Sequence, residues 1–189
     1  FANPRGKEVD LENRLVWRMN RKRIPFETLR DSLLQSAGIL DTRLNGRPEE
    51  LEGNNPTHRR AIYGYIDRNN VSLLLRNFDV AGPNTTVSAR SRTTVPQQAL
   101  FLMNSPFVQM VADKVVVHCG GDIPEAPDTN PEAITSRIDL MYHQILQREP
   151  ESSERTAAME YISTGGATKQ AWKELAQVLL LTNEFSFID

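Results

Sequence analysis

The chain has 189 residues, 39% of them hydrophobic, and is long enough to bury a core as one domain or as a domain with a small appendage. Its 22 basic and 24 acidic residues give a formal net charge of -2, which excludes a global positive field for nucleic acid or an anionic membrane. A single cysteine, Cys119, excludes an internal disulfide framework and a cysteine-rich zinc or iron–sulfur site in this chain. No apolar run approaches the roughly 20 residues of a transmembrane helix.

Two helices are predicted near the N-terminus. Asp10 can cap a helix that ends in the basic run Arg18 to Arg23, where positive charge meets the negative end of the helix dipole. The apolar stripe of this helix would consist of Leu11, Leu15 and Met19. A second helix is predicted from Pro25, which suits a first helical position, to Gly38, which suits a left-handed position just past the end. Because the chain starts at Phe1 and not at methionine, we expect it to be a piece of a longer protein.

The next part of the chain is dominated by loops. Residues 41–58 are rich in Asn, Gly, Pro and acid and keep no helical or strand period, which predicts a long loop. At most a short strand or hairpin is expected near residues 60–67, where apolar and aromatic residues alternate. A short helix over 71–77 and a loop over 78–91 follow.

A segment with two helix starts comes next. Thr94 has the spacing of a capping box with Gln97, and Pro96 fits the first turn because its missing N–H is not needed there. The run 99–103 is so apolar that we expect it to be buried on all sides. A second start follows at Ser105 and Pro106. The apolar stripe of that second helix would consist of Phe107, Val108, Val111, Ala112, Val115 and Val116.

The C-terminal part is predicted to contain helices alone. Residues 120–130 are rich in Gly, Pro, Asp and Glu and are expected to form a loop or linker between a larger part, 1–119, and a helical part, 131–189. Helix N-caps are predicted at Asn130, near Ser152 and at Thr168. We therefore expect residues 1–189 to form one mainly α, irregular helical domain with long loops.

Polar side chains gather around the entry to the apolar helix after residue 95. The binding candidates are Asp79, Arg90, Arg92, Thr94, Gln97 and Asn104. An Arg92–Asp79 ion pair could pin the loop against the helix, which is a structural role, or the group could line a cleft for a polar ligand such as a sugar. The sequence leaves both interpretations open.

Other chemistry is poorly supported. The three histidines, His58, His118 and His143, include no pair at the spacing that places two imidazoles on one metal ion, so no metal site and no cofactor is expected. The run Arg18 to Arg23 lacks interleaved aromatic residues, and the pI is about 6.0, which disfavours nucleic acid. The question of catalysis stays open, and the lack of a nucleophile favours a protein that is not an enzyme.

Three blocks of this sequence resemble one family. The signature Arg90 to Val108 reads RSRTTVPQQALFLMNSPFV. The opening block is Asn13 to Asn20 followed by the helix expected from Pro25 to Gly38, and the closing block is Ile145 to Pro150 together with Leu175 to Asp189. Together they resemble the planctomycete-specific C-terminal domain of unknown function called PSD-one, domain of unknown function 1553. The resemblance extends over nearly the whole chain.

The resemblance implies a setting and no activity. Members typically carry this domain at the C-terminal end of a large exported bacterial protein, behind other domains that often include a c-type cytochrome-like module. It therefore implies an extracytoplasmic location, with the preceding domains of the parent chain as partners. Many members have a cysteine before the signature where this chain has Thr86, and the haem-attachment pattern Cys-x-x-Cys-His is absent here.

Two functions follow as hypotheses. The first is a non-catalytic structural or interaction domain that packs against preceding domains of an exported multidomain protein or binds a polysaccharide. The alternative is a carbohydrate-active hydrolase or glycan-binding module, in which Asp79, Arg92 and an acid from the loop 41–58 would meet in one cleft.

Overall fold

The computed structural model describes residues 4–53, 55–121 and 130–188, and its fold is mainly α, as predicted. The elements in chain order are α1 (Pro4–Val9), β1 (Lys22–Arg23), α2 (Phe26–Ser36), the 3-10 helix η1 (Ala61–Tyr63), α3 (Leu73–Asn77), α4 (Pro96–Asn104), α5 (Pro106–His118), α6 (Pro131–Leu146), α7 (Ser152–Thr164), α8 (Lys169–Leu180), α9 (Asn183–Ser186) and β2 (Phe187–Ile188). In this described part, β1 and β2 form a two-stranded antiparallel sheet. Its register places Lys22 opposite Ile188, which brings the beginning and the end of the body together.

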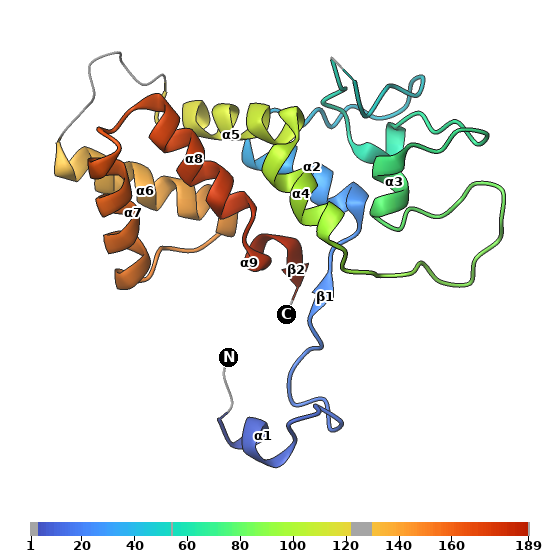
Figure 1. The fold of residues 1–189 in the computed structure, drawn as a ribbon, viewed down its shortest axis with the longest axis horizontal. Helices are drawn as coiled ribbons and strands as arrows, with labels where there is room; N and C mark the ends of the chain where they lie inside the picture. The colour runs from blue at the N-terminus through green and yellow to red at the C-terminus, as the bar shows by residue number, and fades with distance from the viewer. Residues whose placement is uncertain (1–3, 54, 122–129, 189) are drawn as a thin grey trace.

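The helices are arranged around α2, α4 and α5. Figure 1 shows α6, α7 and α8 on one side of this centre, and α3 with its neighbouring loops on the other. Residues 4–21, which we call the N-terminal arm, project away from the rest of the chain and contain α1. The arm joins the body through β1.

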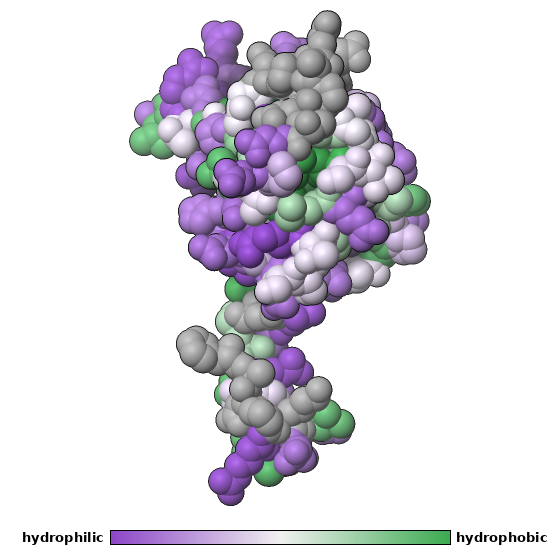
Figure 2. All heavy atoms as spheres, turned by 90° about the vertical axis from the view of Figure 1, so that its left-hand side faces the viewer, coloured by the Kyte–Doolittle hydropathy of each residue, from purple (hydrophilic) through white to green (hydrophobic). Residues whose placement is uncertain are grey.

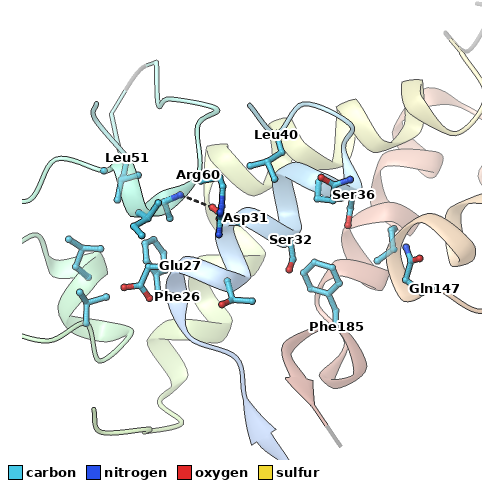
Figure 3. Close-up of a pocket in the computed structure, with 18 of the residues that line it drawn as sticks. Phe26, Glu27, Asp31, Ser32, Ser36, Leu40, Leu51, Arg60, Gln147 and Phe185 are labelled. Atoms are coloured by element: carbon cyan, nitrogen blue, oxygen red, sulfur yellow. Dashed lines mark hydrogen bonds and ion pairs between the residues drawn. The ribbon is translucent and has the colours of Figure 1, made fainter. Parts of the chain in front are cut away.

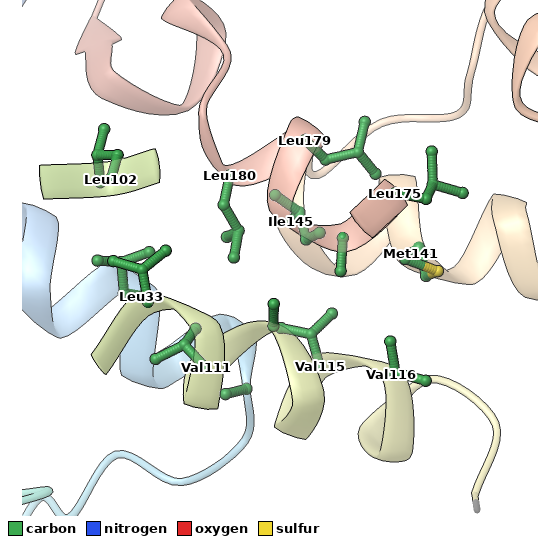
Figure 4. Packing of buried hydrophobic residues seen from close by; sticks show 14 of the residues in the cluster. Leu33, Leu102, Val111, Val115, Val116, Met141, Ile145, Leu175, Leu179 and Leu180 are labelled. Carbon is green, nitrogen blue, oxygen red and sulfur yellow. The ribbon is translucent and has the colours of Figure 1, made fainter. Parts of the chain in front are cut away.

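The core is built on the apolar face of α5. Its buried residues, at spacings of three and four, are Val108, Val111, Ala112, Val115 and Val116, so the predicted stripe is confirmed except for the half-buried Phe107. Figure 4 shows Val111, Val115 and Val116 on the side of α5 that faces Leu175, Leu179 and Leu180 of α8, with Met141 and Ile145 of α6 beside them. Because these helices are far apart in sequence, this cluster joins the central part to the C-terminal helices.

Most predicted helix ends are confirmed. Ser105, Asn130 and Thr168 each accept a backbone N–H into the side-chain oxygen, at 3.1 to 3.3 Å. At the end of α2, Gly38 has φ of +67°, and its N–H donates to the carbonyl of Gln35 at 2.9 Å. A side chain is disfavoured there for a second reason, because a Cβ atom on Gly38 would lie 2.5 Å from Nδ1 of the exposed His118 and the imidazole would have to shift.

The helix predicted after Asp10 is wrong. Asn13 and Val16 have φ of 56° and 54°, which no helix accommodates, and the carboxylate of Asp10 accepts the N–H groups of Arg14 and Leu15 in a turn. Asn13 is buried and donates to the carbonyl of Arg18 at 2.8 Å. The arm is therefore held by side-chain hydrogen bonds instead of a helical stripe, and Leu11, Leu15 and Met19 stay exposed.

Near residues 60–67, where at most a short strand or hairpin is expected, no strand forms. This segment begins with the 3-10 helix η1, and afterwards only Gly64 makes an isolated bridge, with Glu49. The sheet in the described part pairs residues 22–23 with 187–188 instead. Of the apolar residues in this segment Ala61 is buried, whereas Ile62, Tyr65 and Ile66 are exposed, so the segment lacks the buried face of a strand. The long loop over 41–58 is confirmed, with isolated bridges alone.

The start of α4 lies one residue later than predicted. Val95 is the N-cap residue, and Oε1 of Gln98, not of Gln97, accepts its N–H at 3.2 Å. The expectation that residues 99–103 are buried on all sides is wrong as well, since Leu100 and Met103 are about half exposed.

The last two predictions concern the linker before the C-terminal helices and membrane-spanning helices. Most of the linker expected at 120–130 lies outside the described residues. No single helix in the described ranges has the length and apolar character to cross a membrane, whereas α4 and α5 together do by length and composition and are bent by 52°.

Candidate functional site

Asp79 joins the end of α3 to the signature segment. It has φ of 56°, and its N–H donates to the carbonyl of Arg76 at 3.2 Å, which is the left-handed ending of a helix that a short polar residue tolerates. Its carboxylate then accepts the N–H of Thr93 at 2.6 Å and the hydroxyl of the same residue at 2.9 Å. The hydrogen-bond partner of Asp79 is therefore Thr93, and not Arg92 as the sequence suggested.

Gln98 and Arg90 attach the same segment to two other elements. Gln98 is 2% exposed, and its Nε2 donates to the carbonyl of Asn77 at 2.7 Å. Arg90 pairs with Glu27 of α2 at 2.8 Å. Gln98 thus joins α4 to the end of α3, and Arg90 joins the loop before α4 to α2. The polar groups of Gln98 and Arg90 therefore have partners within the chain.

The structure brings three of the six binding candidates together. Asp79, Arg90 and Arg92 line a small hollow of about 70 Å³. The side chains of the other three candidates, Thr94, Gln97 and Asn104, are exposed and do not line it. A hollow of this size has room for two or three water molecules and not for a sugar ring.

A much larger groove of about 1230 Å³ follows the outer side of α2, and we call it the α2 groove. Figure 3 shows Glu27, Asp31, Ser32 and Ser36 of α2 along it, with Phe185 lying opposite Ser32. The loop residues Leu51 and Arg60, and Gln147 at the end of α6, border the groove from other directions. Sequence reasoning missed this site because its walls come from segments that are more than a hundred residues apart.

The acids of the α2 groove all have cationic partners. Glu27 pairs with Arg90, Asp31 pairs with Arg60 at 3.3 Å, and Glu184 pairs with Arg148 at 2.6 Å. Asp31 also accepts the N–H of Ala61 at 2.7 Å. No histidine or cysteine lines the groove among the described residues. The arrangement is therefore suited to hydrogen bonding with a polar polymer, and it offers no unpaired acid and base for general catalysis.

Two buried arginines hold the loop 41–58. Arg59, 4% exposed, donates to the carbonyls of Arg43 and Arg47 and to Glu49, each at 3.2 Å. Hydrogen bonds from the hydroxyl of Thr57 and then from Arg59 hold the pKa of Glu49 below its ordinary value. The sequence analysis predicted neither the role of Arg59 nor that of Glu49. The sequence feature that could have indicated them is a long loop with few apolar residues, because its backbone carbonyls need side chains with several N–H donors.

Arg30 supports this loop from the body. It donates to the carbonyls of Arg59, at 3.0 Å, and Thr57. Its guanidinium group lies over the ring of Phe107 at 5.1 Å. Burial lowers the pKa of Arg30, and the charge of Asp31 partly offsets this effect.

The N-terminal arm is the second feature with a possible binding role. Its exposed large apolar side chains are Val9, Leu11, Leu15, Val16 and Met19, which are 51% to 78% exposed. Figure 2 shows the arm as a separate mass below the body, with hydrophobic residues among hydrophilic ones on its surface. Residues 4–21 hold 5 basic and 3 acidic residues, whereas the rest of the chain holds 17 basic and 21 acidic ones. The arm is thus both apolar and basic.

Comparison with known proteins gives one match. A family model described as a protein of unknown function, DUF1553 (PSD1), matches residues 2–162. This chain belongs to the DUF1553 family. No curated protein and no solved structure matches it. The matched range contains the N-terminal arm, the signature segment and α2, whereas Glu184 and Phe185 of the α2 groove lie beyond it.

The DUF1553 chain shows no metal-binding cluster in its described residues, where no group of three His, Cys, Asp or Glu side chains could hold an ion. Burial raises the pKa of the Cys119 thiol to about 11, against the effect of Arg137. A thiol of this kind is protonated at neutral pH, so Cys119 is unsuited to be a nucleophile.

Proposed function

We propose that this DUF1553 chain is a non-catalytic interaction domain of an exported multidomain bacterial protein. The N-terminal arm docks on a preceding domain of the same parent chain, which can be a c-type cytochrome-like module. The observation that carries this proposal is the group of large apolar side chains that the arm exposes. Single exposed apolar residues are ordinary, but a row of them on one projecting segment is typical of an interface.

The charge of the arm restricts the kind of partner surface that could bind it. Because the arm has 5 basic and 3 acidic residues, the matching surface would be apolar with an acidic rim. The body of the chain is itself acidic, and the described residues of the arm that carry the exposed side chains lie away from it. A partner surface with these properties would cover the apolar residues and pair with Arg14 or Arg18 at the edge.

The experiment compares two variants of the intact parent protein by hydrogen exchange. In the first variant Leu11, Leu15 and Met19 are replaced by serine. The control replaces Leu44, Leu73 and Leu100, which are also exposed but lie on the body. We expect faster exchange in the arm and in the partner domain in the first variant alone. Equal exchange in both variants would reject the docking role of the arm.

A second candidate function is glycan binding in the α2 groove, because its lining includes uncharged polar side chains, Ser32, Gln35 and Gln147, near the ring of Phe185. Hydroxyl and amide groups beside an apolar surface suit a polar polymer. Titration with soluble polysaccharide fragments tests this function. Phe185→Ala should weaken binding at least tenfold, whereas Tyr161→Ala, outside the groove, should not. Release of reducing ends that Asp79→Asn abolishes would instead support a hydrolase.

A further inference from the structure

We infer that the DUF1553 chain binds a small apolar carboxylate, of the size of benzoate, in a hollow between α2, α4 and α5, with Arg30 as the carboxylate-binding residue. The hollow has a volume of about 170 Å³ and is separate from both the α2 groove's polar lining and the arm. A dry cavity of about 150 Å³ is known to hold benzene, so a single ring with a small substituent fits this volume.

The lining is mainly aromatic and aliphatic. The residues that define its floor and walls are Phe26, Leu29, Leu33, Leu51, Phe101 and Phe107. Four of them are buried, and the other two, Phe101 and Phe107, are partly buried. The rim includes the exposed residues Glu52 and Pro106. The hollow therefore offers a ring-sized apolar interior with access from one edge.

Arg30 is the polar group in this apolar interior. It is 2% exposed, and it lines the hollow. A guanidinium group has five N–H donors. Two carbonyls, of Arg59 and Thr57, accept from Arg30 in the described part of the chain, and no carboxylate forms an ion pair with it there. The donors that remain on Arg30 and its positive charge, which the neighbouring Asp31 offsets only in part, favour an anionic ligand in this apolar surrounding.

The N-terminal end of α5 also favours an anionic ligand in the hollow. Ser105, Pro106 and Phe107 line the hollow, and the N-terminal end of a helix favours negative charge. The end of α4 lies next to it, but Nε2 of Gln177 donates to the carbonyls of Leu102 and Met103 at 3.3 and 2.7 Å. The opposing negative end of α4 is thereby partly satisfied. The carboxylate of Glu52, at the rim, already accepts the hydroxyl of Ser72 at 2.5 Å.

The ligand class follows from these features together. The ring packs on Phe101 and Phe107, and the carboxylate takes the unused donors of Arg30 in a forked geometry. A neutral ring of the same size gains the apolar contacts alone. A short carboxylate such as acetate gains the charge interaction alone.

The test measures binding of benzoate, toluene and acetate to the 189-residue chain by calorimetry and by two-dimensional NMR. We expect saturable benzoate binding below about 10 mM, with shifted signals in α2 and α5, and at least tenfold weaker binding of toluene and acetate. Equal binding of benzoate and toluene, or no saturable benzoate binding, would overturn the inference.

Variants separate the hollow from its surroundings. Leu74 lines the hollow, whereas Leu73, on the same helix, is 73% exposed and does not. Leu74→Phe should abolish benzoate binding by filling space, and Leu73→Phe should leave it unchanged. Arg30→Lys keeps the positive charge but loses the pair of parallel N–H donors of the guanidinium group, so benzoate should bind at least tenfold more weakly. If Arg30→Lys fails to fold, the Leu74 and Leu73 pair still decides, and unchanged binding in Leu74→Phe would reject the site.

Discussion

Gln98 and its neighbour Gln97 provide a direct test of how the signature segment folds. Gln98 is buried and bridges two backbone groups, the carbonyl of Asn77 and the N–H of Val95, whereas Gln97 is exposed. Gln98→Ala removes two hydrogen bonds worth about 1 kcal/mol each and leaves a cavity and two unsatisfied groups. We expect a loss of about 2–4 kcal/mol in the free energy of unfolding. Gln97→Ala should change it by less than about 0.5 kcal/mol.

The assay is urea unfolding followed by circular dichroism, with the free energy obtained by linear extrapolation. A third variant, Gln98→Met, keeps the side-chain volume and loses both hydrogen bonds. It should be destabilised by about 1–2 kcal/mol, between the wild type and Gln98→Ala. If Gln98→Ala and Gln97→Ala cost the same, the bridge to Asn77 does not stabilise the fold and the assignment of Gln98 as the capping residue is wrong.

Three further predictions concern stability and reactivity. Arg148 donates to Glu154 and holds the pKa of that carboxyl at about 2. Because the folded pKa lies below the ordinary value of about 4.5, the ion pair stabilises the fold above pH 4.5, and this stabilisation is lost as the pH falls from about 4.5 to 2. Arg148→Gln should therefore lower the free energy of unfolding by about 1 kcal/mol at pH 7, after discounting for solvent screening, and by less at pH 3, as measured by unfolding at each pH. Gly38→Ala should cost about 1–2 kcal/mol in urea unfolding because it combines a positive φ with a contact to His118, and a smaller loss would mean that this turn is not as tight as described. Alkylation of Cys119 at pH 8 should be at least about a hundredfold slower in the native chain than in guanidinium, because burial raises its pKa to about 11, and equal rates would contradict its burial.

The long helices could be predicted because their patterns are local. In α5 and α8 the buried residues recur every three or four positions, and Ser105 and Thr168 begin these helices with side chains that have one evident use. The arm could not be predicted in the same way. Its apolar spacing suits a helix, but Asn13 donates to the carbonyl of Arg18 and the carboxylate of Asp10 accepts the N–H of Arg14, which holds a backbone with positive φ. Periodicity contains no information about such bonds.

The N-cap of α4 shows most clearly where prediction from local sequence fails. Thr94 with Gln97 and Val95 with Gln98 have the same spacing, and the local sequence favours the first pair because threonine can accept a hydrogen bond and valine cannot. The structure contains the second pair because Gln98 also reaches the carbonyl of Asn77, more than twenty residues away. A tertiary contact decided between two local solutions. The α2 groove also arises from tertiary structure, since Asp31 and Phe185 line one groove only in the fold.

The most characteristic segment of the chain is explained by folding contacts. Asp79 ends α3 and accepts hydrogen bonds from Thr93. Gln98 joins α4 to the end of α3, and Arg90 joins the loop before α4 to α2. Polar groups that satisfy one another in this way have little left to offer a ligand. Other groups that can bind a ligand are the exposed apolar side chains of the N-terminal arm and the donors of Arg30. Binding assays on this domain are therefore best aimed at the arm and at the hollow beside α2, with variants of the signature segment serving as stability controls.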